Sequence, residues 1–240
     1  MNPFRKIKEM FQQNIALNEI MEDMKDLDEV LLEKRLEIFK EKVTPEFSKI
    51  GLTNWNGKYL WYSDFNEDGV KHVIEYNVFK FYGGSFSYGN CFSSVPTISG
   101  KKLVNHRTDK STKIHFFKRL DGWQRSMESN SRKNPDKIST INEQKFRNSL
   151  NDVIVRNLPK LKMWFENFET LEQNIDGLEK DVENPPYEIG QRIISCEYIL
   201  SFLNKQKEDL ETAELWLKRH FNKDLNSEEE IALLTKRIKN

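Results

Sequence analysis

Apolar and polar residues alternate along three consecutive runs in the first half of the chain. The runs are GKYLWYSDF, VKHVIEYNVFKF and GGSFSYGNCFSS, and they begin at Gly57, Val70 and Gly83. A period of two is typical of β-strands, because successive side chains point to opposite faces of a sheet. Asp68-Gly69 and Gly83-Gly84 can adopt the backbone conformations of tight reversals. The pattern therefore predicts an antiparallel meander.

The alternation weakens after the third run. Residues Val95–Arg107 include Pro96 and Gly100, and they are typical of a long hairpin loop or an irregular sheet edge. Alternation returns over Lys113–Lys118, which predicts a fourth strand. Asp121-Gly122 follows and predicts the turn that finishes the sheet.

Apolar residues spaced by three or four predict helices on both sides of this region. The stripes are Phe4, Ile7, Phe11 and Ile15; Leu32, Leu36, Phe39 and Val43; and Phe146, Leu150, Val153 and Ile154. Thr44-Pro45 predicts the start of a short helix that ends at Gly51. Thr140 with Glu143 forms a capping-box pattern for the third stripe, and Pro159 either kinks that helix or starts a new one.

The doublet Pro185-Pro186 predicts a boundary, because neither residue suits a helix interior. Three helical patterns follow it without a strand, and Ser227 with Glu230 predicts the cap of the last one. We therefore expect a sheet domain over residues 1–184 and a helical C-terminal extension over residues 185–240. The expected fold class is α+β, with a small antiparallel sheet of about four strands flanked by helices.

Composition indicates a folded protein without a dominant charge. Of 240 residues, 37% are hydrophobic and 12% are aromatic, which is enough for a sizeable core. Thirty-eight basic and thirty-eight acidic residues cancel, so net charge gives no reason to expect nucleic acid or a membrane as the main partner. No run approaches the roughly 18 apolar residues of a membrane span. Cys91 and Cys196 lack metal-type spacing and suit a reducing compartment, so we expect a cytoplasmic protein.

The sequence contains no catalytic, cofactor or metal motif. His72 and His115 lie in predicted strands and can meet across the sheet, but no third ligand accompanies them, and Glu75 would point to the opposite face from His72. The run GGSFSYG lacks the lysine of a phosphate-binding loop, and Cys91 has no visible base. We therefore expect no catalytic residue, no metal, no cofactor and no enzyme. An enzyme whose site is assembled from distant carboxylates is the alternative.

Charge is distributed unevenly along the chain. Residues 101–137 carry eleven bases and four acids, a net charge of +7, with Phe116, Phe117 and Trp123 between them. The candidate binding residues of this basic segment are Lys101, Lys102, Arg107, Lys110 and Lys113. Lysines and exposed rings are what single-stranded nucleic acid would use. Residues 166–188 carry one base and eight acids, a net charge of −7, so the two segments can instead face each other within the fold or face a protein partner.

The middle of the chain, roughly Leu32–Ile175, contains in order FSKIGL, the three strand runs, RLDGW and LPKLKMWFENFETLEQNI. In this order of elements the chain resembles an uncharacterised bacterial family catalogued as domain of unknown function four-three-zero-four. The resemblance implies an α+β fold and no assigned activity, and some relatives look like immunity-type proteins beside toxins. The acidic N-terminal helix and the tail after Pro185 depart from the family pattern.

Taken together, these features predict a bacterial, cytoplasmic protein-interaction module of an immunity-like kind. Its partner is expected to be another protein, recognised through charged surface, and no membrane is involved. The alternative function is binding of nucleic acid by residues 101–137.

Overall fold

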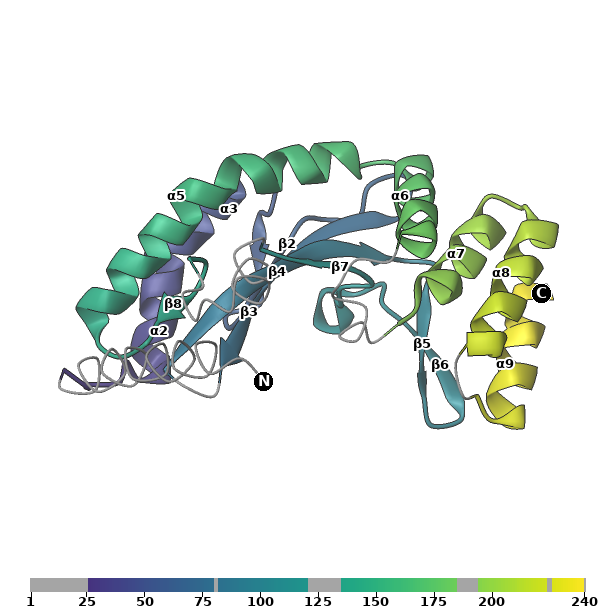
Figure 1. The fold of residues 1–240 in the computed structure, drawn as a ribbon, viewed down its shortest axis with the longest axis horizontal. Coiled ribbons are helices and arrows are strands. Elements are labelled where there is room, and N and C mark those ends of the chain that lie inside the picture. The colour runs from purple at the N-terminus through teal and green to yellow at the C-terminus, as the bar shows by residue number, and fades with distance from the viewer. Residues whose placement is uncertain (1–25, 80–81, 121–134, 185–193, 224–225, 240) are drawn as a thin grey trace, which may run out of the picture.

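The computed structural model describes residues 26–79, 82–120, 135–184, 194–223 and 226–239. The predicted helix over Phe4–Ile15, the turn at Asp121-Gly122 and the doublet Pro185-Pro186 lie outside the described residues. Within them, helices cover one face of a sheet and a group of C-terminal helices stands at one end of it (Figure 1). The expected α+β class is confirmed.

The main sheet is antiparallel and has six strands in the part of the chain that the structure describes. The strands are β1 (Asn54–Trp55), β2 (Leu60–Tyr62), β3 (Val70–Phe79), β4 (Gly83–Phe92), β7 (Phe116–Arg119) and β8 (Ile138–Ser139). Their order is β1-β2-β3-β4-β7, and β8 pairs with β4 at the opposite end from β7. The predicted meander is confirmed, and the predicted fourth strand is present as β7, although it begins at Phe116 and not at Lys113, so that His115 lies before it. β1 and β8 are short additions.

Only one of the two predicted glycine turns is correct. Gly69 has φ +70°, as the reversal before β3 requires. Gly83 and Gly84 instead belong to β4, and the positive φ of 41° falls on Tyr82. A Cβ on Gly84 would lie 2.3 Å from Cζ of Tyr76, so this glycine makes room for a neighbouring ring. Close packing against Tyr76, and not turn geometry, explains why position 84 is a glycine.

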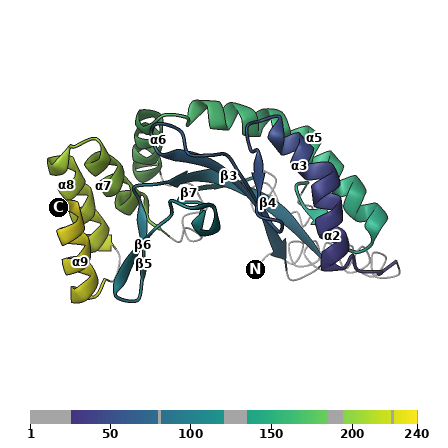
Figure 2. The ribbon, with the colours of Figure 1, turned by 180° about the vertical axis from the view of Figure 1, so that it is seen from behind.

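Strand register decides which side chains meet the helices. Ile74 pairs with Trp61 on β2 and with Tyr88 on β4, and these residues point to one face together with Tyr76 and Phe86. That face is covered by α2 (Leu32–Ile38), a π-helical turn (Phe39–Val43), α3 (Thr44–Ser48) and α5 (Glu143–Asn167) (Figures 1 and 2). The resulting core is rich in edge-to-face aromatic pairs, such as Phe39 with Trp61 at 5.4 Å between centroids.

Helix α5 differs from the prediction in its N-cap and at Pro159. Its N-cap is Asn142, whose side chain accepts from the Lys145 backbone N–H at 2.9 Å, and not Thr140. The helix also continues through Pro159. Proline leaves the carbonyl of Val155, four residues earlier, without its helical donor. Val155 is 66% exposed, so water can replace that donor.

The C-terminal helices form a second core with the end of the sheet. They are α6 (Leu171–Glu183), α7 (Cys196–Gln206), α8 (Leu210–Lys223) and α9 (Glu228–Lys239). Their buried residues pack with Val70 and Phe92 from β3 and β4. Gln206 Nε2 also donates to the Asp68 carbonyl at 2.7 Å, so the last turn of α7 is bonded to the turn before β3. Residues beyond the predicted boundary therefore pack on the sheet.

Residues after β4 form a hairpin of their own. β5 (Pro96–Ser99) and β6 (Lys102–Asn105) pair in an antiparallel two-stranded sheet, where a long loop or irregular edge was expected. Gly100 turns the hairpin with φ +58°, and Tyr198 of α7 donates to the Pro96 carbonyl at 3.1 Å. Among the residues that the structure describes, no helix has the length and apolar character needed to cross a membrane.

Candidate functional site

A groove of about 450 Å³ lies where α3, the β2–β3 connection and the end of α5 meet. It is lined by Lys49, Ile50, Gly51, Ser63, Asp64, Phe65, Asn66, Val70, His72, Lys162, Phe165, Glu166 and Glu169. Its floor contains Phe165, whose ring centroid is 4.5 Å from that of His72. Charged side chains from three separate segments surround this partly apolar floor.

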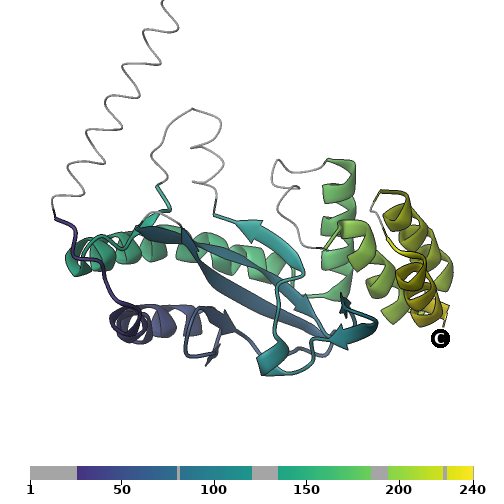
Figure 3. The ribbon, with the colours of Figure 1, turned by 90° about the horizontal axis from the view of Figure 1, so that it is seen from below.

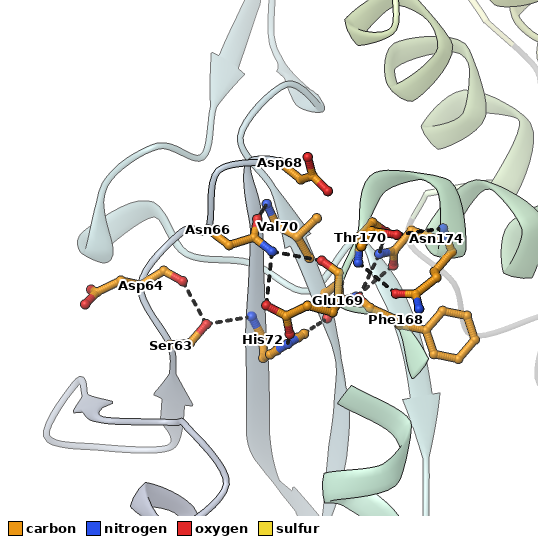
Figure 4. A network of polar contacts seen from close by, with 12 residues as sticks. Ser63, Asp64, Asn66, Asp68, Val70, His72, Phe168, Glu169, Thr170 and Asn174 are labelled. Atoms are coloured by element: carbon orange, nitrogen blue, oxygen red, sulfur yellow. Dashed lines mark hydrogen bonds and ion pairs between the residues drawn. The ribbon is translucent and has the colours of Figure 1, made fainter. Parts of the chain in front are cut away.

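The β2–β3 turn is fixed to the helices by asparagine and aspartate side chains. Asn66 Oδ1 accepts from the Val70 backbone N–H at 2.9 Å, and its Nδ2 donates to the Glu169 carbonyl at 2.8 Å. Asp68 Oδ2 accepts from the Leu171 N–H at 3.0 Å. These bonds hold Glu169, at the α5–α6 junction, over the groove (Figure 4).

His72 is the central polar group of the groove. Its Nε2 lies 2.8 Å from Glu169 Oε2, and its Nδ1 lies 2.8 Å from Asn90 Oδ1. The Asn90 amide can only present its oxygen to His72, because its nitrogen donates to the Phe168 carbonyl and to Asn174 Oδ1. Both partners of His72 are therefore acceptors, and this geometry uses an N–H at each ring nitrogen.

Opposing effects set the pKa of the Glu169 carboxyl group. Partial burial would raise its pKa, but the hydrogen bonds from His72 and Asn66 outweigh burial, and the pKa lies below its ordinary value. Glu169 is therefore ionised at neutral pH and forms an ion pair with His72 when that ring is protonated. A carboxylate that contacts a histidine in this way positions the ring.

The rim charges of the groove are also partnered. Lys49 Nζ lies 2.6 Å from Glu46 Oε1, and Lys162 Nζ lies 3.7 Å from Glu166 Oε1. Asp64 Oδ1 accepts from Asn54 Nδ2 at 3.1 Å. An apolar floor inside a rim of paired, exposed charges is typical of a surface that binds another macromolecule.

The other histidines and the cysteines are engaged in the fold. His115 does not meet His72; its ring stacks on Phe92 and contacts His106, and burial lowers its pKa to about 3. Burial raises the pKa of the Cys91 thiol to about 11, which makes it a poor nucleophile. His220 contacts Ser195 at 2.9 Å. Among the described residues, no group of three or more His, Cys, Asp or Glu side chains could hold a metal ion.

The candidate residues of the basic segment are spread over several elements. Lys101 lies at the tip of the β5–β6 hairpin and pairs with Glu229 of α9 at 3.0 Å, and Lys102 follows it in β6. Arg107 Nε donates to the Ser93 carbonyl at 3.2 Å. Lys110 lies in a short 3-10 helix, Asp109–Ser111, and Lys113 follows that helix. The structure places them along the hairpin and the connection to β7, not around the groove.

One of the three interleaved aromatic residues is withdrawn from solvent, and a second, Phe117, is half-buried. Phe116 is buried in the second core, and Trp123 lies outside the described residues. Lys118 pairs with Asp181 of α6 at 2.7 Å, so the basic and acidic segments do face each other at this point. One ion pair between partly buried side chains therefore joins the two segments, while the exposed candidate bases take no part in it.

Sequence reasoning identified none of the groove's key contacts. His72 was recognised, but its partner Glu169 is 97 residues away and Asn90 is 18 residues away. Sequence analysis placed Ser63 and Asp64 in the first strand run and interpreted Asp68-Gly69 as a tight reversal, so neither pattern indicated a site. No family model, curated protein or solved structure matches this chain. The resemblance over residues 32–175 stays a prediction.

Proposed function

We propose that this protein is a cytoplasmic interaction module that binds another protein at the groove around His72 and Glu169, without catalysing a reaction. The proposal rests on one observation. The histidine in the groove has both ring nitrogens occupied by Asn90 and Glu169, while the surrounding floor and rim have the character of a binding surface. A general base would need a ring nitrogen or carboxylate available to a substrate.

The shape of the groove suits a side chain or a turn presented by a folded partner. Ile50 and Phe65, both half-buried, offer an apolar surface, and Lys162 and Glu166 on α5 offer both signs of charge at the rim. Desolvated apolar contact would supply most of the affinity, and the rim charges would select the partner and orient it. The resemblance to immunity-type proteins suggests a toxin as the partner, which the protein would neutralise by binding.

The test is photo-crosslinking from a rim position in extract of the native cell. A photoreactive amino acid replaces Lys162, whose side chain is 59% exposed, and a matched variant carries it at the exposed Lys218 on α8. We expect a protein adduct at position 162 that survives nuclease and moderately high salt, and none at position 218. Equal adducts at both positions, or turnover of a substrate in a broad hydrolase panel without any adduct, would contradict the proposal.

Nucleic-acid binding is the second candidate, because Lys101, Lys102, Arg107 and Lys110 are all exposed. Contacts to phosphates predict an affinity that falls steeply as salt rises. Neutralising Lys101, Lys102 and Lys110 together would then weaken binding and reduce the salt slope. Fluorescence anisotropy with a labelled single strand measures both effects. On the protein-binding proposal, the anisotropy stays unchanged.

A further inference from the structure

The hairpin of β5 and β6 extends away from the main sheet and stands beside the C-terminal helices (Figures 1 and 3). One of its faces is anchored, because Ile98 and Leu103 pack against the core of those helices. Lys102 and Val104 alternate with Leu103 and lie on the other face, where both are exposed and Val104 keeps 40% of its surface accessible. The hairpin is thus held in place while part of it stays in contact with solvent.

The register of the hairpin determines which backbone groups of β6 point outward. The loop between the strands has two residues, 100 and 101, so the pair next to it, Ser99 with Lys102, exchanges both ladder hydrogen bonds. Hydrogen-bonded and non-hydrogen-bonded pairs alternate along an antiparallel ladder. The backbone N–H and C=O groups of Leu103 and Asn105 therefore point away from β5.

These outward-facing groups form a free edge. Within the described residues, Leu103 and Asn105 make no backbone hydrogen bond to any other segment. The outer edge of β5 differs, because Pro96 has no N–H and its carbonyl accepts from the Tyr198 hydroxyl at 3.1 Å. A row of unpaired N–H and C=O groups is a template on which another strand can pair.

Basic side chains flank the free edge at both ends. Lys102 lies at its loop end, Arg107 and Lys110 follow its other end, and all three are exposed. In the part of the chain that the structure describes, none of these three side chains has an ion pair. The one acid of residues 96–113 is Asp109, which pairs with the buried Lys71 at 2.9 Å. The edge of β6 therefore carries positive charge that no neighbouring acid neutralises.

We propose that the outer edge of β6 pairs with an extended, acidic segment of a partner protein, which adds a third strand to the hairpin. The backbone groups of Leu103 and Asn105 supply the new ladder hydrogen bonds, and the flanking bases select glutamate or aspartate side chains. This contact surface lies outside the groove around His72 and goes beyond the proposed function.

Charge disfavours the other strands that would fit the same edge. Lysines at a sheet edge discourage pairing with neutral or basic strands. A second copy of this chain is also unsuitable. With Leu103 opposite Asn105 of the other copy, Lys101 would lie opposite Arg107, and like charges opposite each other destabilise a sheet. An acidic strand instead meets a base at each end of the edge.

A polypeptide also fits this edge better than a nucleic acid. Phosphates would pair with the flanking bases, but a sugar-phosphate backbone has no regular N–H donors for the carbonyls of Leu103 and Asn105. Another β-strand presents donors and acceptors at the same spacing. Backbone hydrogen bonds would then give affinity, and the charges would give specificity.

The test is amide hydrogen exchange, followed by NMR, on the full chain with acetyl-Glu-Val-Glu-Val-Glu-Val-Glu-amide at millimolar concentration. We expect the N–H groups of Leu103 and Asn105 to become protected. Those of Lys102 and Val104, which are already bonded to β5, should stay unchanged. Protection of alternate residues is the signature of a new strand on β6, whereas equal protection of all four would indicate a general stiffening of the hairpin and overturn the proposal.

Matched peptides and variants separate backbone pairing from charge. The same peptide with every backbone N–H methylated keeps its charge but loses its ladder donors, so it should not protect Leu103. The lysine counterpart of the peptide should not bind. Lys102→Glu should weaken binding of the acidic peptide about tenfold, because an attraction becomes a repulsion. Lys218→Glu, at an exposed position of α8, should leave the affinity unchanged.

Two results would contradict strand addition directly: equal protection by the methylated peptide, or no protection by the acidic peptide. A single-stranded oligothymidylate that shifts the signals of Arg107 and Lys110, while the acidic peptide shifts none, would replace the proposal with nucleic-acid binding. None of these results bears on the groove, which the crosslinking from position 162 tests independently.

Discussion

Lys71 illustrates what a single residue contributes to this fold. Its ammonium group lies 4.8 Å from the ring centroid of Tyr62 and 4.5 Å from that of Phe65, and its partner Asp109 holds the β6–β7 connection over the sheet. A cation between two aromatic faces is stabilised by both rings, but it still needs a counter-charge. The ion pair therefore holds the β6–β7 connection against the sheet.

Asp109→Asn should destabilise the protein by about 2 kcal/mol, because Lys71 would remain buried without its carboxylate partner. Lys71→Met should cost less, since the apolar chain keeps its contacts with the rings and leaves no buried charge. Urea denaturation of both variants measures the difference. Equal losses would mean that the ion pair itself, and not the unpaired cation, determines the effect.

Glu169 should make stability depend on pH in the acid range. Its folded pKa is lowered from 4.5, so its contribution is fully present above that value and is lost as pH falls through the lower folded pKa. Glu169→Gln should therefore lower stability at neutral pH and flatten the loss of stability below pH 4.5. Urea midpoints of wild type, Glu169→Gln and the control Glu67→Gln at several acid pH values measure this. A parallel decline in all three would show that Glu169 is not responsible.

At the scale of elements, strands were easier to predict than helix starts. Alternation identified β3 and β4 almost to the residue, because one face of each is buried against helices. The cap of α9 was also correct: Ser227 Oγ accepts from the Glu230 N–H at 3.3 Å, and Glu230 Oε2 accepts from the Ser227 N–H at 3.0 Å. Both partners of that box are local in sequence, which is why the pattern alone was sufficient.

The cap of α5 was wrong because a non-local contact competes for the same residue. Thr140 donates its N–H to the Tyr82 carbonyl at 2.9 Å, and its carbonyl accepts from Val30 at 3.1 Å. It is thus part of the sheet edge, and the helix starts later, at Asn142.

The groove was missed for the same reason, since its residues come from segments that only the tertiary fold brings together. The glycines of β4 were misread because turn and packing roles look alike in sequence.

Pro159→Ala should stabilise the protein by about 1 kcal/mol, since it restores the helical bond to the Val155 carbonyl and removes the proline ring from an exposed helix interior. Val155→Ala, one turn earlier on the same exposed side, serves as the control and should change little. Thermal unfolding measures both. A loss of stability in Pro159→Ala would mean that the second half of α5 needs the local geometry of proline to place Phe165.

At the scale of the whole molecule, two cores share one side chain. Trp164 of α5 packs against both the helix-covered core of the sheet and the C-terminal core. Lys207 also pairs with Glu172 at 3.3 Å, which bonds the end of α7 to α6. The described C-terminal helices thus pack in one core with residues of the sheet. Sequence analysis had placed a domain boundary between them at residue 185.

Removal of residues 185–240 should therefore expose Val70, Phe92 and Leu178 and leave a poorly soluble remainder. We expect a low soluble yield, binding of a hydrophobic dye and a broad thermal transition. Full-length protein, handled in parallel, should show one cooperative transition and little dye binding. A soluble fragment with a sharp transition would contradict this expectation and support independent domains.

The bond between Gln206 and Asp68 joins residues 138 positions apart, which has a consequence for synthesis on the ribosome. The β3–β4 hairpin is made of neighbouring segments and can form as soon as it emerges, because local pairing is fast. The end of the hairpin that carries Val70 and Phe92, however, stays uncovered until the last quarter of the chain has been translated and α7 can pack on it. During that interval the nascent chain carries an uncovered apolar hairpin end, and this is where a chaperone would act.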